Sequence, residues 1–316
     1  MKRITIVITT YNGALFIEEQ LDSLLGQTVS PDEVLIFDDG SKDDTCSIVE
    51  TYIEKNELRE KWKLIKNVQN KGYARNFVEG AMQAQGLYIF LCDQDDIWMP
   101  DKLEVMANIL DQNEDINLLC SNLEPFYYDE DTRKWDPKVL ESMKNDGSID
   151  RYNLTSSGFH IQRSGCTMCL RNSFLHSIYK YWRADWPHDD FFWKMAAMTG
   201  SCAIVQYTSI KRRMHRNNTS VLRTRTRQWR ISQLKERHTY YQPLMQYAND
   251  VNASKAVKET IQKNLDSIQL RIDLLEKKYI LNIIKLITRY KDCYPRKKGL
   301  YLDIYLAFRD KYEGAN

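Results

Sequence analysis

Short apolar runs alternate with amphipathic segments along the first part of the chain. Four runs rich in Ile, Val, Leu and Phe have the length and composition of buried strands, and they cover residues 3–9, 32–39, 61–67 and 87–92. Between them, apolar residues recur at helical spacing over residues 14–27, 41–55 and 73–86. Strands that alternate with helices of this length predict right-handed crossover connections and a mostly parallel sheet flanked by helices. The predicted fold class is therefore α/β.

Particular residues mark the expected ends of two of these helices. Ser41 is the expected N-cap of the second helix, with Asp43 and Asp44 in its first turn, where the positive end of the helix dipole favours carboxylates. Gly86 is expected to close the third helix, because glycine readily adopts the backbone conformations that end helices.

Polar residues directly follow three of the predicted strands. Residues 9–12 follow the first strand, Asp39 ends the second, and Asp93, Asp95 and Asp96 come after the fourth. Ligands of open α/β sheets collect beyond the carboxyl ends of the strands, so we expect these residues to share one site.

The acidic cluster at Asp93, Asp95 and Asp96 predicts a cation site. Carboxylates that crowd one another raise each other's pKa values, and the arrangement costs free energy unless a cation or a set of donors offsets it. A hard divalent ion such as Mg²⁺ or Mn²⁺ is the simplest offset. Asp95 is the first choice of ligand and Asp93 the second, because alternate residues leaving a strand can turn toward the same site. The alternative is that Asp95 and Asp96 only cap a helix that starts near Pro100.

Composition and charge set limits on these expectations. A chain of 316 residues, of which 43% are hydrophobic and 28% charged, is long enough for one large core or for a core domain with an appendage. Residues 1–210 hold 21 Lys or Arg against 33 Asp or Glu, net −12, whereas residues 211–316 hold 24 against 10, net +14. The acidic part suits a metal-binding enzyme, and the basic part suits an anionic partner.

The cysteines and the N-terminal sequence predict a cytoplasmic location. The seven cysteines are odd in number and lie mostly within apolar runs, which is typical of buried thiols in a reducing compartment. The run after the basic start is short and ends in a turn signal, so we expect neither a signal peptide nor a membrane span. Cys166 and Cys169 form one C-x-x-C pair with no second pair at suitable spacing, which favours a strand here over a zinc site.

Four motifs in the first part of the chain are "ITIVITTYNG", "LIFDDGSKDDT", "NKGYARN" and "FLCDQDDIWMPDKL". In this order and spacing they resemble the nucleotide-binding half of family 2 glycosyltransferases with the GT-A fold. "PHDDFFWKMAAMTG" and "IKRRMHRNNTSV" are similar to the acceptor half of the same family, in the variety found in rhamnosyltransferases of bacterial surface polysaccharides. The resemblance covers roughly residues 2–221. We therefore expect a catalytic domain over 1–222, divided into halves at residue 98, and a basic helical region over 223–316.

The resemblance implies an inverting hexosyltransferase of cell-surface polysaccharide biosynthesis. The acceptor would be a saccharide or a lipid-diphosphate-linked saccharide, and the donor dTDP-rhamnose or, as the second expectation, a UDP-hexose. Breaking the bond from the sugar to phosphate leaves charge on the diphosphate, which bound Mn²⁺ or Mg²⁺ would neutralise. The family pattern makes His215 the third protein ligand of that ion, beside Asp95 and Asp93. The alternative for His215 is a surface histidine.

The nucleoside is expected at the ends of the first two strands. A carboxylate can accept from the imide N–H of uracil or thymine and an aromatic ring can stack on the base, so Asp39 and Tyr11 fit a pyrimidine. The resemblance implies that Thr9 and Asp39 line this pocket, although Asp-Gly-Ser is also an ordinary turn. Lys71 or Arg75 would reach the base or a phosphate, or Arg75 would instead serve the packing of helix on sheet.

A catalytic base is expected in "ADWPHDDFFWKM". Inverting transfer needs the acceptor hydroxyl to be deprotonated as it attacks, and Asp or Glu is the usual agent. By the family pattern, Asp189 takes the position of the base. Asp190 is the alternative, since family members more often carry a large apolar residue there. The same residues also fit the N-terminus of a helix after Pro187, and the two interpretations are compatible.

The basic C-terminal part predicts helices with one apolar and one basic face. Lys and Arg interleave with Ile, Leu, Trp and Tyr over residues 223–241 and 276–312. Such helices can lie on an anionic membrane, which would place the protein peripherally at the inner face. The alternative is a helical cap that packs on the enzyme or on a second subunit.

Two other classes of function compete with this hypothesis. A sugar nucleotidyltransferase also binds a nucleotide through carboxylates on a parallel sheet, but no glycine-rich "GxGTR"-like loop lies near the first strand. A non-catalytic module would bind nucleic acid through the Arg-rich run at 211–237, and salt-dependent binding would reveal it. That alternative leaves the aspartates unexplained, so we expect no nucleic-acid partner.

Overall fold

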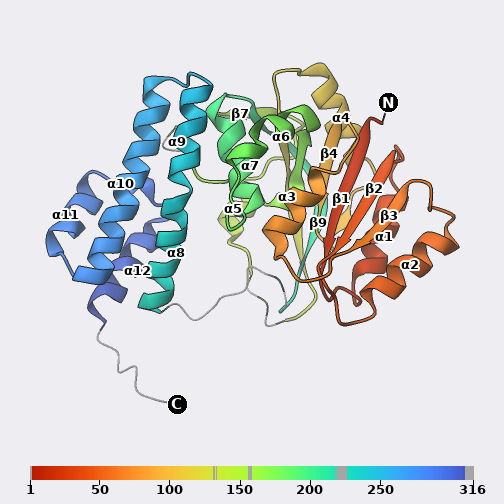
Figure 1. Cartoon of the computed structure of the whole chain (residues 1–316), viewed down its shortest axis with the longest axis horizontal. Helices are drawn as coiled ribbons and strands as arrows, with labels where there is room; N and C mark the ends of the chain where they lie inside the picture. Colours follow the sequence, from red (N-terminus) through yellow and green to blue (C-terminus); the bar gives the residue numbers. More distant parts are fainter. Residues whose placement is uncertain are drawn as a thin grey trace, which may run out of the picture. The chain divides into compact units, whose positions relative to one another are not determined.

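The computed structural model describes residues 2–130, 132, 134–155, 159–216, 218 and 226–309. The chain divides into two compact units, Met1–Asn153 with Ile161–Val221, and Leu154–His160 with Leu222–Asn316 (Figure 1). The parts of the predicted basic segments at 223–225 and 310–312 lie outside the described residues. The boundaries predicted at residues 98 and 222 stay predictions.

The first unit is built on one nine-stranded sheet in the order β3-β2-β1-β4-β8-β6-β9-β5, with β7 paired to β9. The four predicted strands are all present. The strands are β1 (Ile4–Thr10), β2 (Glu33–Asp38), β3 (Trp62–Lys66), β4 (Tyr88–Cys92), β5 (Ile97–Trp98), β6 (Leu118–Tyr127), β7 (Ile149–Tyr152), β8 (Met168–Arg171) and β9 (Cys202–Met214).

The first four strands are parallel, and the rest of the sheet is mixed. β8 runs antiparallel to both β4 and β6, and β6 is parallel to β9. The carboxyl ends of β1, β2, β3, β4, β6 and β9 therefore lie along one edge of the sheet, which we call the carboxyl edge. This edge collects the loops that carry the predicted chemistry.

Helices cover both faces of the sheet. They are α1 (Ile17–Leu25), α2 (Thr45–Lys55), α3 (Tyr73–Ala81), α4 (Lys102–Gln112), α5 (Pro137–Glu141), α6 (Asn172–Ile178) and α7 (His188–Met198), with short 3₁₀ turns at Gly165–Thr167 and Tyr179–Tyr181. Alternate strand residues such as Ile4, Ile6 and Ile8 form one core with α1, α2 and α4. On the other face α3 lies beside α7 (Figure 1), and a Cβ at Gly80 of α3 would come within 2.7 Å of the Phe37 ring.

Two predicted helix ends are wrong, because the residues have other roles. Ser41 is not an N-cap: α2 begins at Thr45, and the Ser41 hydroxyl donates to Asp38. The aspartates expected in its first turn precede the helix, and Asp43 instead accepts from the Thr45 N–H at 3.1 Å. α3 already ends at Ala81, and Gly86 lies where a Cβ would approach the Thr5 nitrogen to 2.6 Å, so it serves close packing before β4.

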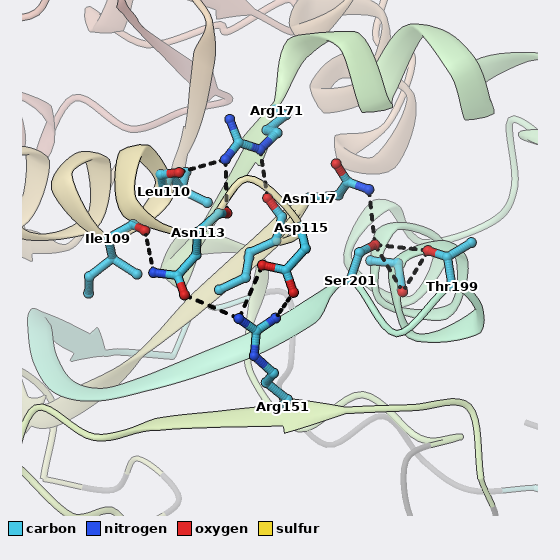
Figure 2. A network of polar contacts seen from close by, with 11 residues as sticks. Ile109, Leu110, Asn113, Asp115, Asn117, Arg151, Arg171, Thr199 and Ser201 are labelled. Atoms are coloured by element: carbon cyan, nitrogen blue, oxygen red, sulfur yellow. Dashed lines mark hydrogen bonds and ion pairs between the residues drawn. The ribbon is translucent and has the colours of Figure 1, made fainter.

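A polar network ties the sheet together at the amino end of β6 (Figure 2). Arg171, at the end of β8, donates to the carbonyl oxygens of Leu110 at 2.6 Å, in the last turn of α4, and of Asn113 at 3.0 Å, the C-cap of α4. Arg151 of β7 pairs with Asp115 and donates to Asn113 at 3.1 Å. The network lies at the opposite end of β6 from the carboxyl edge, so we assign it to the scaffold.

The second unit is helical, as predicted for the C-terminal region. Its helices are α8 (Arg227–Thr239), α9 (Tyr241–Asp250), α10 (Lys255–Lys277), α11 (Ile280–Thr288) and α12 (Lys297–Phe308), with a 3₁₀ turn at Lys291–Cys293. The long helix α10 contacts all four others. Buried Asp303 accepts from Arg230 and Arg271, each at 2.7 Å, and so joins α12 to α8 and α10. Among the described residues, each helix is too short or too polar to cross a bilayer.

Candidate active site

The loops after β1 and β2 are joined into one platform at the carboxyl edge. The Asn12 N–H donates to the Ser41 hydroxyl, and the Lys42 N–H donates to the Asn12 side chain, both at 2.8 Å. The Gly13 N–H donates to the Thr45 hydroxyl, also at 2.8 Å. Because both predicted nucleoside-binding motifs contribute to these bonds, the two loops hold each other in place.

Asp39 is buried and organises a third loop. Its carboxylate accepts from the Asn67 side chain at 3.0 Å and from the backbone N–H groups of Lys71 and Gly72, each at 2.8 Å. An ionised carboxylate offers about four acceptor positions, so one remains after these three bonds. Tyr11 is 48% exposed on the neighbouring loop. The structure thus brings Asp39 and the Lys71 backbone together and leaves a ring and an acceptor position for a base.

The side chains of Lys71 and Arg75 share a single carboxylate. Lys71 donates to Glu79 at 2.9 Å and Arg75 donates to the other oxygen of Glu79 at 2.6 Å. Thr9 lies near the end of β1, in register with Phe37, and is half-buried. These contacts do not test whether Thr9 lines the nucleoside pocket or whether Lys71 or Arg75 reaches the base or a phosphate. These roles stay predictions.

Gln94 joins the acidic loop to the first motif, a role that sequence reasoning missed. Its side-chain oxygen accepts from the Tyr11 N–H at 2.7 Å, and its side-chain nitrogen donates to the Tyr11 carbonyl at 3.2 Å. A Cβ at Gly13 would collide with the Gln94 side chain. Glycine at this position therefore allows the loops after β1 and β4 to meet.

Asp95 and His215 are in direct contact, although 120 residues separate them in the sequence. Nε2 of His215 and Oδ2 of Asp95 lie 2.7 Å apart. Asn218 supports the pair: its side chain donates to Asp95 at 3.3 Å and accepts from the His215 N–H at 2.7 Å. His215 follows β9 and Asp95 follows β4, so the common direction of these strands places both at the carboxyl edge.

Asp93 forms a second acidic group with Asp96 and Cys166. Within the part of the chain that the structure describes, one ligand atom from each of the three lies within 4.8 Å of the others. Burial raises the pKa of Asp93 to about 6 and that of Asp96 to about 8, and the charge of Asp95 adds to both rises. One Asp96 oxygen accepts from the Arg213 N–H at 3.0 Å, whereas the other is buried without a partner among the described residues.

Two arginines that precede His215 contact this region, and Arg212 balances part of its negative charge. The positive charge of Arg212 opposes the rise in the pKa values of Asp93 and Asp96, and its guanidinium donates to the Ser164 hydroxyl at 2.8 Å. Arg213 donates to the Asp95 carbonyl at 2.9 Å. Sequence reasoning missed both residues, and their place in "KRRMH" at the end of a strand was the available signal.

The carboxylate oxygens of Asp93 and Asp96 fit a hard divalent cation. Carboxylate oxygens suit Mg²⁺ and Mn²⁺, and the orphaned Asp96 oxygen with the raised pKa values marks a place where positive charge is missing. Burial raises the pKa of the Cys166 thiol, which therefore stays protonated and is a poor ligand for such an ion. The helix-cap alternative for Asp95 and Asp96 is wrong, because α4 begins at Lys102 after Asp101.

Asp189 lies in the first turn of α7, which starts directly after Pro187. Burial is the main cause that raises the pKa of Asp189 to about 6, and the charges of Asp190 and Asp93 contribute to this rise. The influence of Asp93 means that the candidate base and the acidic loop lie close enough for their charges to interact. A carboxyl group with a pKa near neutrality is suited to take a proton from a hydroxyl.

His188 is the first residue of α7, and its buried ring anchors the start of this helix. The ring lies 4.3 Å from the Phe77 ring of α3, centroid to centroid, and a Cβ at Gly165 would collide with it. Both ring nitrogens are buried without hydrogen-bond partners among the described residues, and burial lowers the pKa of His188 to about 3. His188 is therefore a neutral packing residue that sets the position of Asp189.

Asp190, the alternative base, is engaged in the scaffold. Its carboxylate accepts from the indole N–H of the buried Trp186 at 2.8 Å and pairs with the largely buried Lys194. These contacts stabilise the first turns of α7. The geometry therefore favours Asp189 over Asp190 for proton transfer.

We expect Asp190→Ala to lower the free energy of unfolding by about 3 kcal/mol, because it removes the carboxylate that pairs with the largely buried ammonium of Lys194 and accepts from the Trp186 N–H. Urea denaturation measures this change. The matched control is Asp115→Ala, which removes an exposed ion pair with Arg151 and is expected to cost less than about 1 kcal/mol. Equal losses in the two variants would contradict the structural role of Asp190.

Comparison with known sequences shows the protein family to which this chain belongs. The sequence profile described as "Glycosyl transferase family 2" matches residues 5–176. An uncharacterized glycosyltransferase of Haemophilus influenzae is 26% identical over 247 residues, covering 75% of this chain and 74% of that protein. An uncharacterized glycosyltransferase of Rickettsia prowazekii is 27% identical over 69% of this chain and 65% of its own length.

Solved structures share the fold. S. aureus TarS 1-349 in complex with UDP superposes with a TM-score of 0.60 at 16% identity, over 97% of this chain and 81% of that one. The mannosyltransferase PcManGT from Pyrobaculum calidifontis, in complex with GDP-Man and Mn²⁺, gives a TM-score of 0.54 at 15% identity, over 96% and 85% of the two chains. The match to the family profile over more than half of the sequence, on a fold shared with these solved structures, shows that the chain belongs to glycosyl transferase family 2 and is a GT-A glycosyltransferase.

Proposed function

We propose that this glycosyltransferase moves a sugar, with inversion at the anomeric carbon, from a nucleoside-diphosphate donor to a hydroxyl of a saccharide or of a lipid-diphosphate-linked saccharide. The observation that carries the proposal is the meeting of three groups at the carboxyl edge: the Asp95–His215 pair, the Asp93–Asp96 pair and the half-buried Asp189. The first two suit a cation and a diphosphate. The third suits an acceptor hydroxyl.

The donor diphosphate would lie against the acidic loop. Asp95 and Asp93, with His215 as the third ligand, would hold Mn²⁺ or Mg²⁺, which neutralises negative charge on a leaving diphosphate. The pKa values of Asp93 and Asp96 stay raised although the positive charge of Arg212 opposes the rise, which supports a cation here. The solved structure of PcManGT holds Mn²⁺ together with a nucleotide sugar, which supports the same assignment by analogy.

The nucleoside would lie on the platform of the first two loops. Tyr11 offers an exposed ring for stacking, and Asp39 keeps one acceptor position for the imide N–H of a pyrimidine. Thr9 lines the same pocket in this proposal, and Lys71 or Arg75 approaches the base or a phosphate. We propose dTDP-rhamnose as the first donor and a UDP-hexose as the second; TarS is solved with UDP and with UDP-GlcNAc.

Asp189 would act as the general base. Its carboxylate takes the proton from the acceptor hydroxyl as the oxygen attacks the face of the sugar opposite the diphosphate. The buried ring of His188 and the neighbouring Asp190 keep its backbone in place. In this proposal the reaction belongs to cell-surface polysaccharide biosynthesis and takes place in the cytoplasm.

Release of nucleoside diphosphate from a panel of dTDP-, UDP- and GDP-sugars tests this function. The purified protein is incubated with each donor and a set of saccharide acceptors, in Mn²⁺ or in EDTA. We expect one donor to be turned over in Mn²⁺ and not in EDTA. Full turnover in EDTA would contradict the metal assignment, and failure to bind any of the donors would contradict the proposed substrate class.

A further inference from the structure

Helix α11 carries a stripe of large apolar side chains that the second unit leaves open to solvent. The stripe follows the spacing of one helix face, because its members recur three or four positions apart. Its side chains are between 48% and 72% exposed, and they are Ile280, Leu281, Ile284 and Ile287. Contiguous apolar surface of this kind marks a place where something else binds.

Helix α12 carries a second stripe of exposed apolar side chains. Tyr301, Tyr305 and Phe308 recur at positions i, i+4 and i+7, and their side chains are between 42% and 68% exposed. α11 and α12 contact each other directly. We call the two stripes together the α11–α12 face.

The opposite sides of both helices are already packed within the second unit. Leu286 is fully buried, and the Asn282 side chain donates to the carbonyl of Leu270 on α10 at 3.2 Å. On α12, Leu306 and Ala307 are buried. Each helix is therefore packed on its inner side within the second unit, and the α11–α12 face is what this packing leaves over.

The segment that carries the face has a strongly basic sequence. Residues 277–309 hold nine Lys or Arg and two Asp or Glu. One of the two acids, Asp303, is buried between Arg230 and Arg271, so it offers no negative charge at the surface. Lys285 and Arg289 of the same segment are exposed.

The positive charge of this segment favours an anionic lipid surface over a second copy of the chain as the binding partner of the face. A second copy of the chain, packed through the same surface, would bring the same basic side chains against each other, which costs free energy. An anionic lipid surface complements both features: apolar side chains enter the acyl boundary while Lys and Arg meet the headgroups. Tyr residues such as Tyr301 and Tyr305 favour that boundary.

We propose that the α11–α12 face binds the interface of a bilayer that contains anionic lipids. The proposal rests on the second unit alone and does not depend on which sugar the first unit transfers. Binding combines burial of the two apolar stripes with attraction between the basic side chains and the lipid headgroups. It therefore requires anionic lipid and weakens as salt screens the charges.

Sedimentation of the full chain with vesicles tests this proposal. Vesicles of phosphatidylcholine alone are compared with vesicles that also contain phosphatidylglycerol, at low and high salt. We expect the protein to pellet with the anionic vesicles at low salt and to be released at high salt. Ile284→Asp is expected to lower the affinity for anionic vesicles at least about tenfold, since it removes an exposed isoleucine that would enter the bilayer and adds a negative charge.

The matched control is Leu87→Asp. Leu87 is an exposed leucine of the first unit, at the amino end of β4 and away from the carboxyl edge, so the variant makes the same change of charge and polarity elsewhere. It is expected to bind vesicles as the wild type does. Ile284→Gln provides a second variant without added charge, and circular dichroism verifies that each variant is folded.

Three results would overturn the proposal. Equal binding of the wild type and both Ile284 variants would remove the face from the interaction, and equal binding to neutral and anionic vesicles would remove the role of charge. A concentration-dependent dimer that Ile284→Asp dissociates, in a protein that binds no vesicles, would assign the face to a second copy.

Discussion

Asp189→Asn is expected to lower kcat for sugar transfer by about 10²- to 10⁴-fold while the dissociation constant of the donor changes less than about threefold. The substitution keeps the shape of the side chain and removes its ability to accept a proton. Donor affinity is preserved because the nucleoside platform and the acidic loop are built from other segments. Steady-state kinetics gives the first quantity and calorimetry the second. A variant with wild-type kcat would exclude Asp189 as the base.

The pH dependence provides a second readout of the same residue. Burial raises the pKa of Asp189 to about 6, so its carboxyl is protonated and inactive as a base well below that pH. The rate of the wild type should therefore rise with pH through about 6 and level off above it. Asp189→Asn should lose this limb of the profile. If the variant kept the same limb, another group would be responsible for it.

Asp95→Ala is expected to abolish the dependence of nucleotide binding on divalent ions. The change removes the first-choice ligand and also the partner of His215 at 2.7 Å, and loss of partners around metal sites costs 10- to 100-fold or more in affinity. Calorimetry with a nucleoside diphosphate, in Mn²⁺ and in EDTA, should show at least about a 100-fold difference for the wild type and little for the variant.

The control for this prediction is Asp115→Ala, at the amino end of β6 in the network of Figure 2. It removes one carboxylate, as Asp95→Ala does, but far along β6 from the carboxyl edge. Its nucleotide binding should keep the metal dependence of the wild type. If the metal dependence survives in Asp95→Ala, Asp95 is not an essential ligand, and Asp93 with Asp96 would hold the ion without it.

The pattern of apolar residues was sufficient for the first four strands and the helices between them. β1, β2 and β4 are compact runs buried on both faces, whereas β3, at the edge of the sheet, is partly exposed. β1 to β4 are parallel as the alternation predicts. The pattern did not predict that β8 would insert antiparallel between β4 and β6. Order in the sheet depends on which distant segments pair, and short apolar runs carry no signal for that.

Helix ends and the roles of individual site residues were harder to predict, because they also depend on contacts that form only in the folded chain. Ser41 and Gly86 have the right chemistry for helix ends, but Ser41 bonds to Asp38 within its own turn and Gly86 packs against the distant Thr5. Asp95 and His215 were paired through the family resemblance, and no spacing rule connects them. Gln94 and Arg212 were missed because their partners come from other loops, which only the folded chain brings together.

The anomeric configuration of the product tests the central claim most directly. The donor that is turned over is used with its acceptor, and NMR of the product compares the configuration at the transferred sugar with that of the donor. A base at Asp189 acting on the acceptor hydroxyl predicts a single displacement, so the configuration should be inverted. A product with retained configuration would contradict the assignment of Asp189 and the mechanism built on it.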